Sequence, residues 1–219
     1  MPEKETRTKA DGIGVPKFSR RQFLQRLGIT TGGAFVATLS LVSACKRAEP
    51  TTGTTSNTGT NTAPTFSYTV PAAPPPLVPV PGLSNCTVAT DRLYTNYHVW
   101  VKLVSTGVVV LGITSPMVKI LGEPHAMTLP DVGLKLAKDD SFSSIEGYKM
   151  ATDIFTPVSG AIVQINDSLR DWLRGGNIQP IEYHPYTHGW IIAIQLSKPD
   201  ELKDLLDSKG YLALLSKST

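Results

Sequence analysis

One lysine in this 219-residue sequence is placed where its amine could carry a covalently attached group. Residues 141–145 and 152–155 each have the composition of a β-strand, so Lys149 is expected at the tip of a hairpin. A hairpin tip is easily reached by a modifying enzyme and by other active sites. The pattern indicates a swinging-arm carrier. The alternative is an ordinary exposed lysine, because most lysines lie at the surface.

Other residues whose side chains could bind a metal or act as a nucleophile are poorly arranged for either role. His184 and His188 have a metal-like spacing, but Pro185 and Gly189 oppose a shared helix face, and no cysteine cluster joins them. Ser159 follows a turn and has no evident base partner in the sequence. We therefore predict no catalytic residue and no metal site, and a carrier subunit rather than an enzyme.

The elements that would position the lysine are short and mostly β. Further strands are expected at residues 98–104, 107–114, 125–129, 160–165 and 190–196. Ser115 is expected to cap a short helix, with Pro116 at its first position and Gly122 beyond its end. Two more short helices are expected at residues 167–174 and 199–206. Many short strands and few helices predict packed sheets around one core.

An ordered set of motifs runs through this β-rich part. In chain order they are Tyr94-Thr95, His98-x-Trp100-Val101, Gly112-Ile113-Thr114, Leu121-Gly122, Leu129-Pro130-x-Val132-Gly133, Glu146-x-x-Lys149, Pro157-Val158-Ser159-Gly160, Val163-x-x-Asn166 with Leu169, Pro185-Tyr186-x-x-Gly189-Trp190, and Leu202-x-x-Leu205-Leu206 with Tyr211. Together they resemble the motifs of the H protein family of the glycine cleavage system. Members of this family are lipoyl carriers.

The resemblance implies a mainly β fold, the barrel-sandwich hybrid of lipoyl domains with short peripheral helices. It implies lipoate in amide linkage at Lys149, with Glu146 in the recognition context of the lysine. Three departures lie around the site: Val99 stands where the family usually has a carboxylate, and Gly147 and Tyr148 stand where it usually has Ser and Val.

The resemblance also implies partners. These are the enzymes that attach lipoate and the lipoyl-dependent enzymes of glycine cleavage, between which the family carries an aminomethyl group. An envelope redox or sulfur-carrier system is the expectation if the protein is exported. The alternative function is an unmodified scaffold or interaction module at the cell envelope.

The first 45 residues predict an export signal. Arg20 and Arg21 precede Phe-Leu and a weakly apolar run over residues 27–44, which is the order of a twin-arginine signal. The run ends in Leu-Val-Ser-Ala before Cys45, which resembles a lipobox and predicts lipidation of that cysteine. The expected location is the outer side of the cytoplasmic membrane. An uncleaved membrane anchor is the alternative, although the run is at the short limit for a span.

Residues 46–85 are expected to tether the domain of residues 86–219 to the membrane. The Thr/Gly-rich stretch 51–62 predicts a flexible coil, and the proline-dense stretch 71–81 predicts a stiffer spacer. Cys86 remains unpaired in this arrangement. It is a chance residue, an intermolecular bridge, or a thiol that exchanges with the lipoyl disulfide.

The formal net charge of +3 does not describe the exported part. Nine of the 21 basic and four of the 18 acidic residues lie in the first 50 positions, which leaves 12 basic and 14 acidic residues beyond them. Nucleic-acid binding would call for a basic patch, so no nucleic-acid partner is expected.

Overall fold

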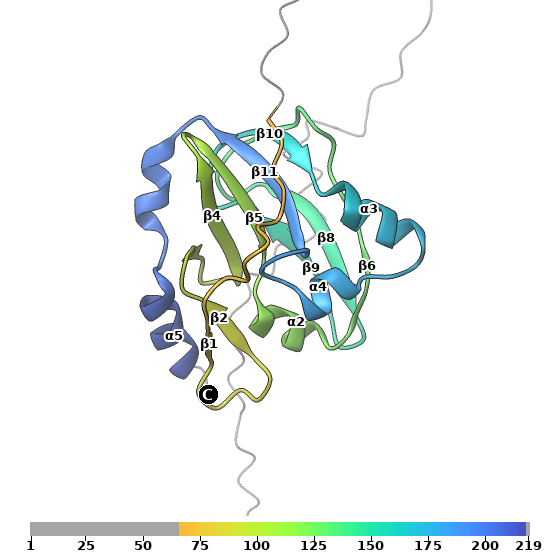
Figure 1. The fold of residues 1–219 in the computed structure, drawn as a ribbon, viewed down its shortest axis with the longest axis vertical. Coiled ribbons are helices and arrows are strands. Elements are labelled where there is room, and N and C mark those ends of the chain that lie inside the picture. Colours follow the sequence, from red (N-terminus) through yellow and green to blue (C-terminus); the bar gives the residue numbers. More distant parts are fainter. Residues whose placement is uncertain (1–65, 218–219) are drawn as a thin grey trace, which may run out of the picture. The chain divides into compact units, whose positions relative to one another are not determined.

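The computed structural model describes residues 66–217, all within one compact unit. The predicted twin-arginine signal, Cys45 and the Thr/Gly-rich stretch lie outside the described residues. The described part is mainly β with short peripheral helices, which confirms the predicted fold class (Figure 1). Over residues 66–217, no helix is both long enough and apolar enough to cross a membrane.

Two antiparallel sheets enclose the main core. The larger sheet has the strand order β3 (Leu93–Tyr94), β4 (Val99–Ser105), β5 (Val108–Ile113), β11 (Trp190–Leu196), β10 (Gly160–Ile165) and β7 (Lys135–Leu136). The smaller sheet has the order β6 (Pro124–Met127), β8 (Ser141–Gly147) and β9 (Ala151–Phe155). Apolar side chains of both sheets meet in a single cluster, so the hairpin formed by β8 and β9 stands on the main core.

The central strand β5 is buried on both faces. Val109 and Leu111 pack in the core between the sheets, whereas Val108 and Val110 belong to a second apolar cluster on the opposite face. This follows from the two-residue side-chain period of a strand. It also explains why the strand reads as a continuous apolar run, as strands buried on both faces do.

The N-terminal boundary of the domain differs from the prediction. β1 (Leu77–Pro79) pairs with β2 (Thr87–Ala89), and the side chains of Val80 and Cys86 are buried in the second cluster. The expectation that residues 71–81 form only a spacer is therefore wrong. We call residues 66–90 the N-terminal strap.

The first part of the strap lies extended against the larger sheet. The backbone N–H of Tyr68 donates to Gln164 Oε1 at 2.6 Å, and Gln164 Nε2 donates to the Tyr68 carbonyl at 3.3 Å. The Tyr68 ring meets Trp190 edge-on, with centroids 5.3 Å apart. Phe66, Tyr68 and Val70 are half-buried at alternate positions. These apolar side chains cover the sheet, which is why the segment packs despite its prolines.

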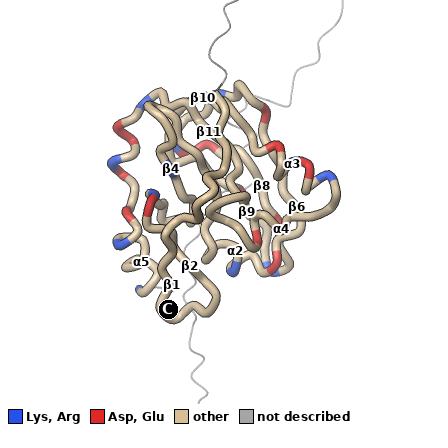
Figure 2. The backbone as a smooth tube through the Cα atoms, viewed as in Figure 1, with Lys and Arg blue, Asp and Glu red and all other residues tan. Residues whose placement is uncertain are grey.

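Between residues 66 and 217, five short helices lie around the sheets. They are α2 (Ser115–Leu121), α3 (Asp167–Arg174), α4 (Gln179–Tyr183), the 3₁₀ helix η1 (Pro199–Asp204) and α5 (Ser208–Ser216). The strap and α5 cover the second apolar cluster, and α2 lies beside the smaller sheet (Figure 1). Charged residues of both signs are spread over the described chain, and α3 carries both (Figure 2).

The C-terminal helix prediction is wrong in its bounds. The expected helix at residues 199–206 is a 3₁₀ turn that ends at Asp204, and Leu205 is extended. A separate helix, α5, then begins after Asp207, whose side chain accepts from the N–H of Gly210 at 2.7 Å. The predicted helix is thus a shorter 3₁₀ turn, and the aspartate N-cap begins a second helix that the apolar spacing did not predict.

Candidate functional site

Lys149 lies at the tip of the β8–β9 hairpin, as predicted. Glu146 and Ala151 are the last paired residues, and the N–H of Gly147 donates to the carbonyl of Met150 at 2.9 Å to close the turn. The Lys149 side chain is exposed. The hairpin therefore presents the amine to solvent on a short, closed turn.

The turn rests on the C-terminal end of α2. The N–H of Tyr148 donates to the Gly122 carbonyl at 2.8 Å, and the N–H of Lys149 donates to the Leu121 carbonyl at 2.9 Å. The last carbonyls of a helix have no partner within the helix, so these two bonds supply partners for them. The hairpin tip is thereby fixed to an element outside its own sheet.

Two glycines make this close approach possible. A Cβ at Gly147 would lie 2.4 Å from the Leu121 carbonyl oxygen, and a Cβ at Gly122 would lie 2.5 Å from Lys149 Cγ. Gly122 has φ +65 and its N–H bonds to the Val118 carbonyl, which ends α2. The aliphatic stem of Lys149 therefore lies across a residue that has no side chain.

The other end of α2 is held by a buried polar network. Thr114, not the predicted Ser115, is the N-cap, because its hydroxyl accepts from the N–H of Met117 at 3.3 Å. The Thr114 hydroxyl lies 2.9 Å from the Tyr211 hydroxyl, which lies 2.6 Å from His98 Nδ1. Ser115 is instead the first helical residue, and its N–H donates to the Tyr186 hydroxyl at 3.1 Å. The network links α2 to α5 and to the start of β4.

Burial lowers the pKa of His98 to about 4 from its ordinary value of 6.5. Nε2 of this ring has no hydrogen-bond partner among the described residues. Burial likewise raises the pKa of Tyr211, so the phenol stays protonated. The neutral imidazole is thus the form that the folded protein accommodates.

We expect His98 to make the domain less stable in mild acid. The unfolded chain binds a proton near pH 6.5 and the folded chain only near pH 4. The contribution of His98 to the free energy of unfolding is therefore complete above pH 6.5. It is lost as the pH drops toward 4, and this loss lowers the stability by up to about 3 kcal/mol. Urea unfolding of wild type and His98→Asn between pH 4 and 6.5 measures this loss of stability. Asparagine is chosen because it does not titrate and tolerates the positive φ of 69 at this position.

The His125→Asn variant is the control for the substitution itself, because it makes the same chemical change at an exposed histidine. A His98→Asn variant whose stability falls with pH as steeply as that of wild type would contradict the assignment.

An aromatic pair lies beside the lysine. The register of β6 against β8 shifts between Pro124 and Ala126, which leaves His125 in a bulge. Bulges re-aim side chains near functional sites, and the His125 ring lies 5.0 Å from that of Tyr148. Tyr148 is 77 % exposed. Glu146 is exposed next to the turn and forms no salt bridge with another described residue.

The other candidate residues are not part of this site. His184 and His188 are exposed, with rings 5.8 Å apart, and residues 66–217 contain no group of three or more side chains that could hold a metal ion. Ser159 does have a carboxylate partner that the sequence did not reveal. Its N–H and hydroxyl donate to Glu201 at 2.6 and 3.0 Å, and its hydroxyl accepts from the N–H of Lys138. This group ties the start of β10 to η1.

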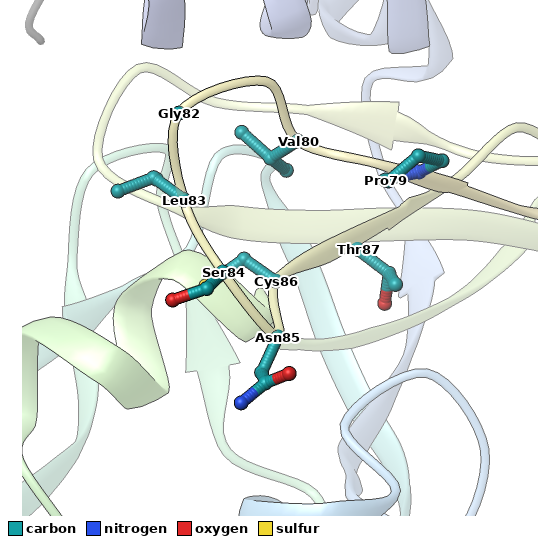
Figure 3. A pocket seen from close by; sticks show the side chains of 8 residues that line it. All are labelled: Pro79, Val80, Gly82, Leu83, Ser84, Asn85, Cys86 and Thr87. Atoms are coloured by element: carbon teal, nitrogen blue, oxygen red, sulfur yellow. The ribbon is translucent and has the colours of Figure 1, made fainter.

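Cys86 is 3 % exposed, which favours a residue of the core over a bridging or exchanging thiol. It lines a hollow of about 530 Å³ on the loop between β1 and β2 (Figure 3). The lining residues belong to this loop and to the strand ends that flank it: Pro79, Val80, Gly82, Leu83, Ser84, Asn85, Cys86 and Thr87. The hollow holds no charged side chain and is separate from the lysine turn.

Residues 92–218 match the protein family described as Glycine cleavage H-protein. The glycine cleavage system H protein of Vibrio cholerae (strain O395) is 37 % identical over 120 residues, which cover 55 % of this chain and 91 % of that protein. The H protein of Chromohalobacter salexigens is 37 % identical over 129 residues, covering 59 % and 95 %. The crystal structure of a glycine cleavage system H protein from Mycobacterium marinum aligns with a TM-score of 0.52 at 29 % identity, covering 59 % of this chain and 99 % of that one.

The matched region contains the β8–β9 hairpin with Lys149, and the N-terminal strap precedes it. From residue 92 onward, the motifs, the strand arrangement and the lysine turn agree with this assignment. The chain belongs to the glycine cleavage H-protein family, whose members carry lipoate covalently on a lysine.

Proposed function

We propose that Lys149 is the lipoate attachment site of this lipoyl carrier. The observation that carries the proposal is the fixed backbone and free side chain of this residue at the hairpin tip. Its amine forms no salt bridge with a described residue, so an amide can form there without breaking one. The solvent side of the turn has room for a long chain.

Bound lipoate supplies a disulfide ring that can be reduced and can hold a group through sulfur. The residues of this chain contribute position and recognition. The closed turn on α2 presents the arm from a rigid base, so no loop has to be ordered each time a partner binds. Glu146 and Tyr148 flank the amine and are exposed to any enzyme that reaches it. We infer that the chain is a substrate-like carrier without catalytic activity of its own.

Members of the family work with the glycine cleavage enzymes. For this chain we propose partners outside the cytoplasm, because Arg20 and Arg21 start a twin-arginine signal and Cys45 ends it in a lipobox-like sequence. More than one acyl chain is needed for durable anchoring, since a single chain binds membranes only marginally. An envelope redox or sulfur-carrier system is the partner class that this location favours.

Export by the twin-arginine route also has a consequence for modification. This route carries folded proteins, and activated lipoate is a cytoplasmic compound. We propose that the domain folds and receives lipoate at Lys149 before it crosses the membrane. The chain between Cys45 and the strap then tethers the finished carrier to the membrane surface.

The mass of the native protein, purified from the membrane fraction and digested, tests these proposals together. We expect a new N-terminus at Cys45 with acyl groups on it, lipoate on the peptide that contains Lys149, and an unacylated peptide with Cys86 as the internal control. A bare Lys149 in cells that make lipoate would favour the scaffold instead. An intact N-terminal signal would favour the uncleaved membrane anchor.

A further inference from the structure

We propose that the C-terminal end of α2 is a positioning element for lipoate attachment, which fixes the place and direction from which the Lys149 side chain leaves the turn. The proposal rests on the proposed function of Lys149. The residues that carry it are Leu121 at the end of α2, its C-cap Gly122, and Gly147 in the turn.

The first argument is the hydrogen bonding of the turn. Three successive N–H groups, those of Gly147, Tyr148 and Lys149, all have backbone partners, and the last two donate to α2. Exposed hairpin tips usually leave such groups to water. A turn whose N–H groups are all satisfied by other backbone atoms has little freedom to move. The Lys149 Cα is therefore held by both the hairpin and the helix.

The second argument is the absence of side chains where the two elements meet. Ending α2 in the left-handed region explains a glycine at Gly122, but asparagine also adopts this conformation. The lack of room for a side chain explains why glycine is preferred over asparagine, because a Cβ at Gly122 would also lie 2.6 Å from Lys149 Cδ. Gly147 has no positive φ, and its Cβ would collide with the Leu121 backbone. Gly147 therefore serves the backbone contact between turn and helix, and Gly122 leaves room for the aliphatic stem of Lys149.

The chemistry of attachment explains why such precision matters. The neutral lysine amine attacks the acyl carbon of lipoyl adenylate, an amide C–N bond forms, the acyl–phosphate C–O bond breaks, and AMP leaves with the electron pair while the nitrogen loses a proton to solvent. The transfer requires the nitrogen close to the acyl carbon and aligned with it. A misplacement of about 1 Å costs on the order of 100-fold in rate.

The protein offers a matched pair of variants to test this. Gly122 and Gly176 have φ of +65 and +71, so alanine imposes similar backbone strain at both. A Cβ at Gly176 has nothing within 4 Å, whereas a Cβ at Gly122 meets the lysine stem. We expect Gly122→Ala to lower kcat/KM for lipoate transfer by a purified lipoate ligase by about 10-fold to 100-fold, and Gly176→Ala to stay near wild type.

Hydrogen exchange provides a second readout that does not depend on lipoate. The amides of Tyr148 and Lys149 should be protected in wild type and in Gly176→Ala, and should exchange faster in Gly122→Ala. If Gly122→Ala does not fold, Gly147→Ala perturbs the same contact from the turn. Its control is Gly175→Ala, since Gly175 also lacks a positive φ and its Cβ would lie no nearer than 3.4 Å to another atom.

The outcomes separate the two proposals. Equal transfer rates for Gly122→Ala and Gly176→Ala overturn the positioning role, as does lost amide protection with an unchanged transfer rate. A wild-type protein that the ligase does not modify at Lys149 overturns the attachment site itself. In that case the exchange comparison still shows whether α2 holds the turn.

Discussion

Replacing Lys149 by arginine is expected to abolish lipoyl addition and carrier function while the fold stays intact. Arginine keeps the positive charge and a similar length, but its guanidinium does not lose its proton in proteins and cannot act as the nucleophile. The side chain is exposed and in no salt bridge with the described residues. The change in unfolding free energy should therefore stay within about 0.5 kcal/mol, as for most surface substitutions.

The measurement is peptide mass spectrometry of protein made in cells with a lipoate ligase, combined with growth or enzyme assays that depend on the carrier. Lys135→Arg is a suitable control, because this lysine is also exposed but lies on β7. It should remain fully lipoylated. Retention of function in the Lys149→Arg protein would remove the carrier role and leave the unmodified scaffold as the better hypothesis.

The core of the fold could be predicted because its strands and helices carry strong local patterns. The apolar runs of β10 and β11 predicted their observed bounds, 160–165 and 190–196. The helix at 167–174 was also correct, and the side chain of Asn166 caps it by accepting from the N–H of Leu169 at 3.1 Å. Burial of the apolar runs favours the two strands, and the local Asn166 cap favours the helix.

The N-terminal strap could not be predicted from composition. Prolines and small polar residues make up about half of its sequence, and these are typical of linkers. Its packing depends on apolar residues at alternate positions and on an acceptor, Gln164, that lies 96 residues further along the chain. The strap also lies before the region matched to the family, so the resemblance carried no information about it.

The lysine turn was predictable, but its support was not. Two β-strands around Lys149 and the Glu-x-x-Lys motif predicted the hairpin tip from neighbouring residues alone. The contact with α2 is made by backbone atoms, which leave no mark on side-chain patterns apart from the two glycines. The network behind α2 joins His98 to Tyr211 across 113 residues. Contacts at such separation follow from the complete fold and not from any local pattern.

Trp100 is the side chain whose loss should destabilise the domain most. It is 1 % exposed, and its Nε1 donates to the Pro185 carbonyl at 3.0 Å. The guanidinium of Arg92 lies 4.5 Å from the centre of its ring. On the opposite strand, a Cβ at Gly112 would lie 2.6 Å from the ring, so the indole packs directly on the β5 backbone. One residue thus joins β4, β5 and the loop before β11.

We expect Trp100→Ala to lower the free energy of unfolding by about 3–5 kcal/mol, the range for removing a buried aromatic side chain. The cavity, the unpaired Pro185 carbonyl and the lost cation–π contact all act in this direction. Urea unfolding compares this variant with Trp172→Ala, which makes the same chemical change on α3 at a side chain that is 44 % exposed. Trp172→Ala should cost about 1 kcal/mol or less. Equal losses for the two variants would show that the second apolar cluster does not depend on Trp100.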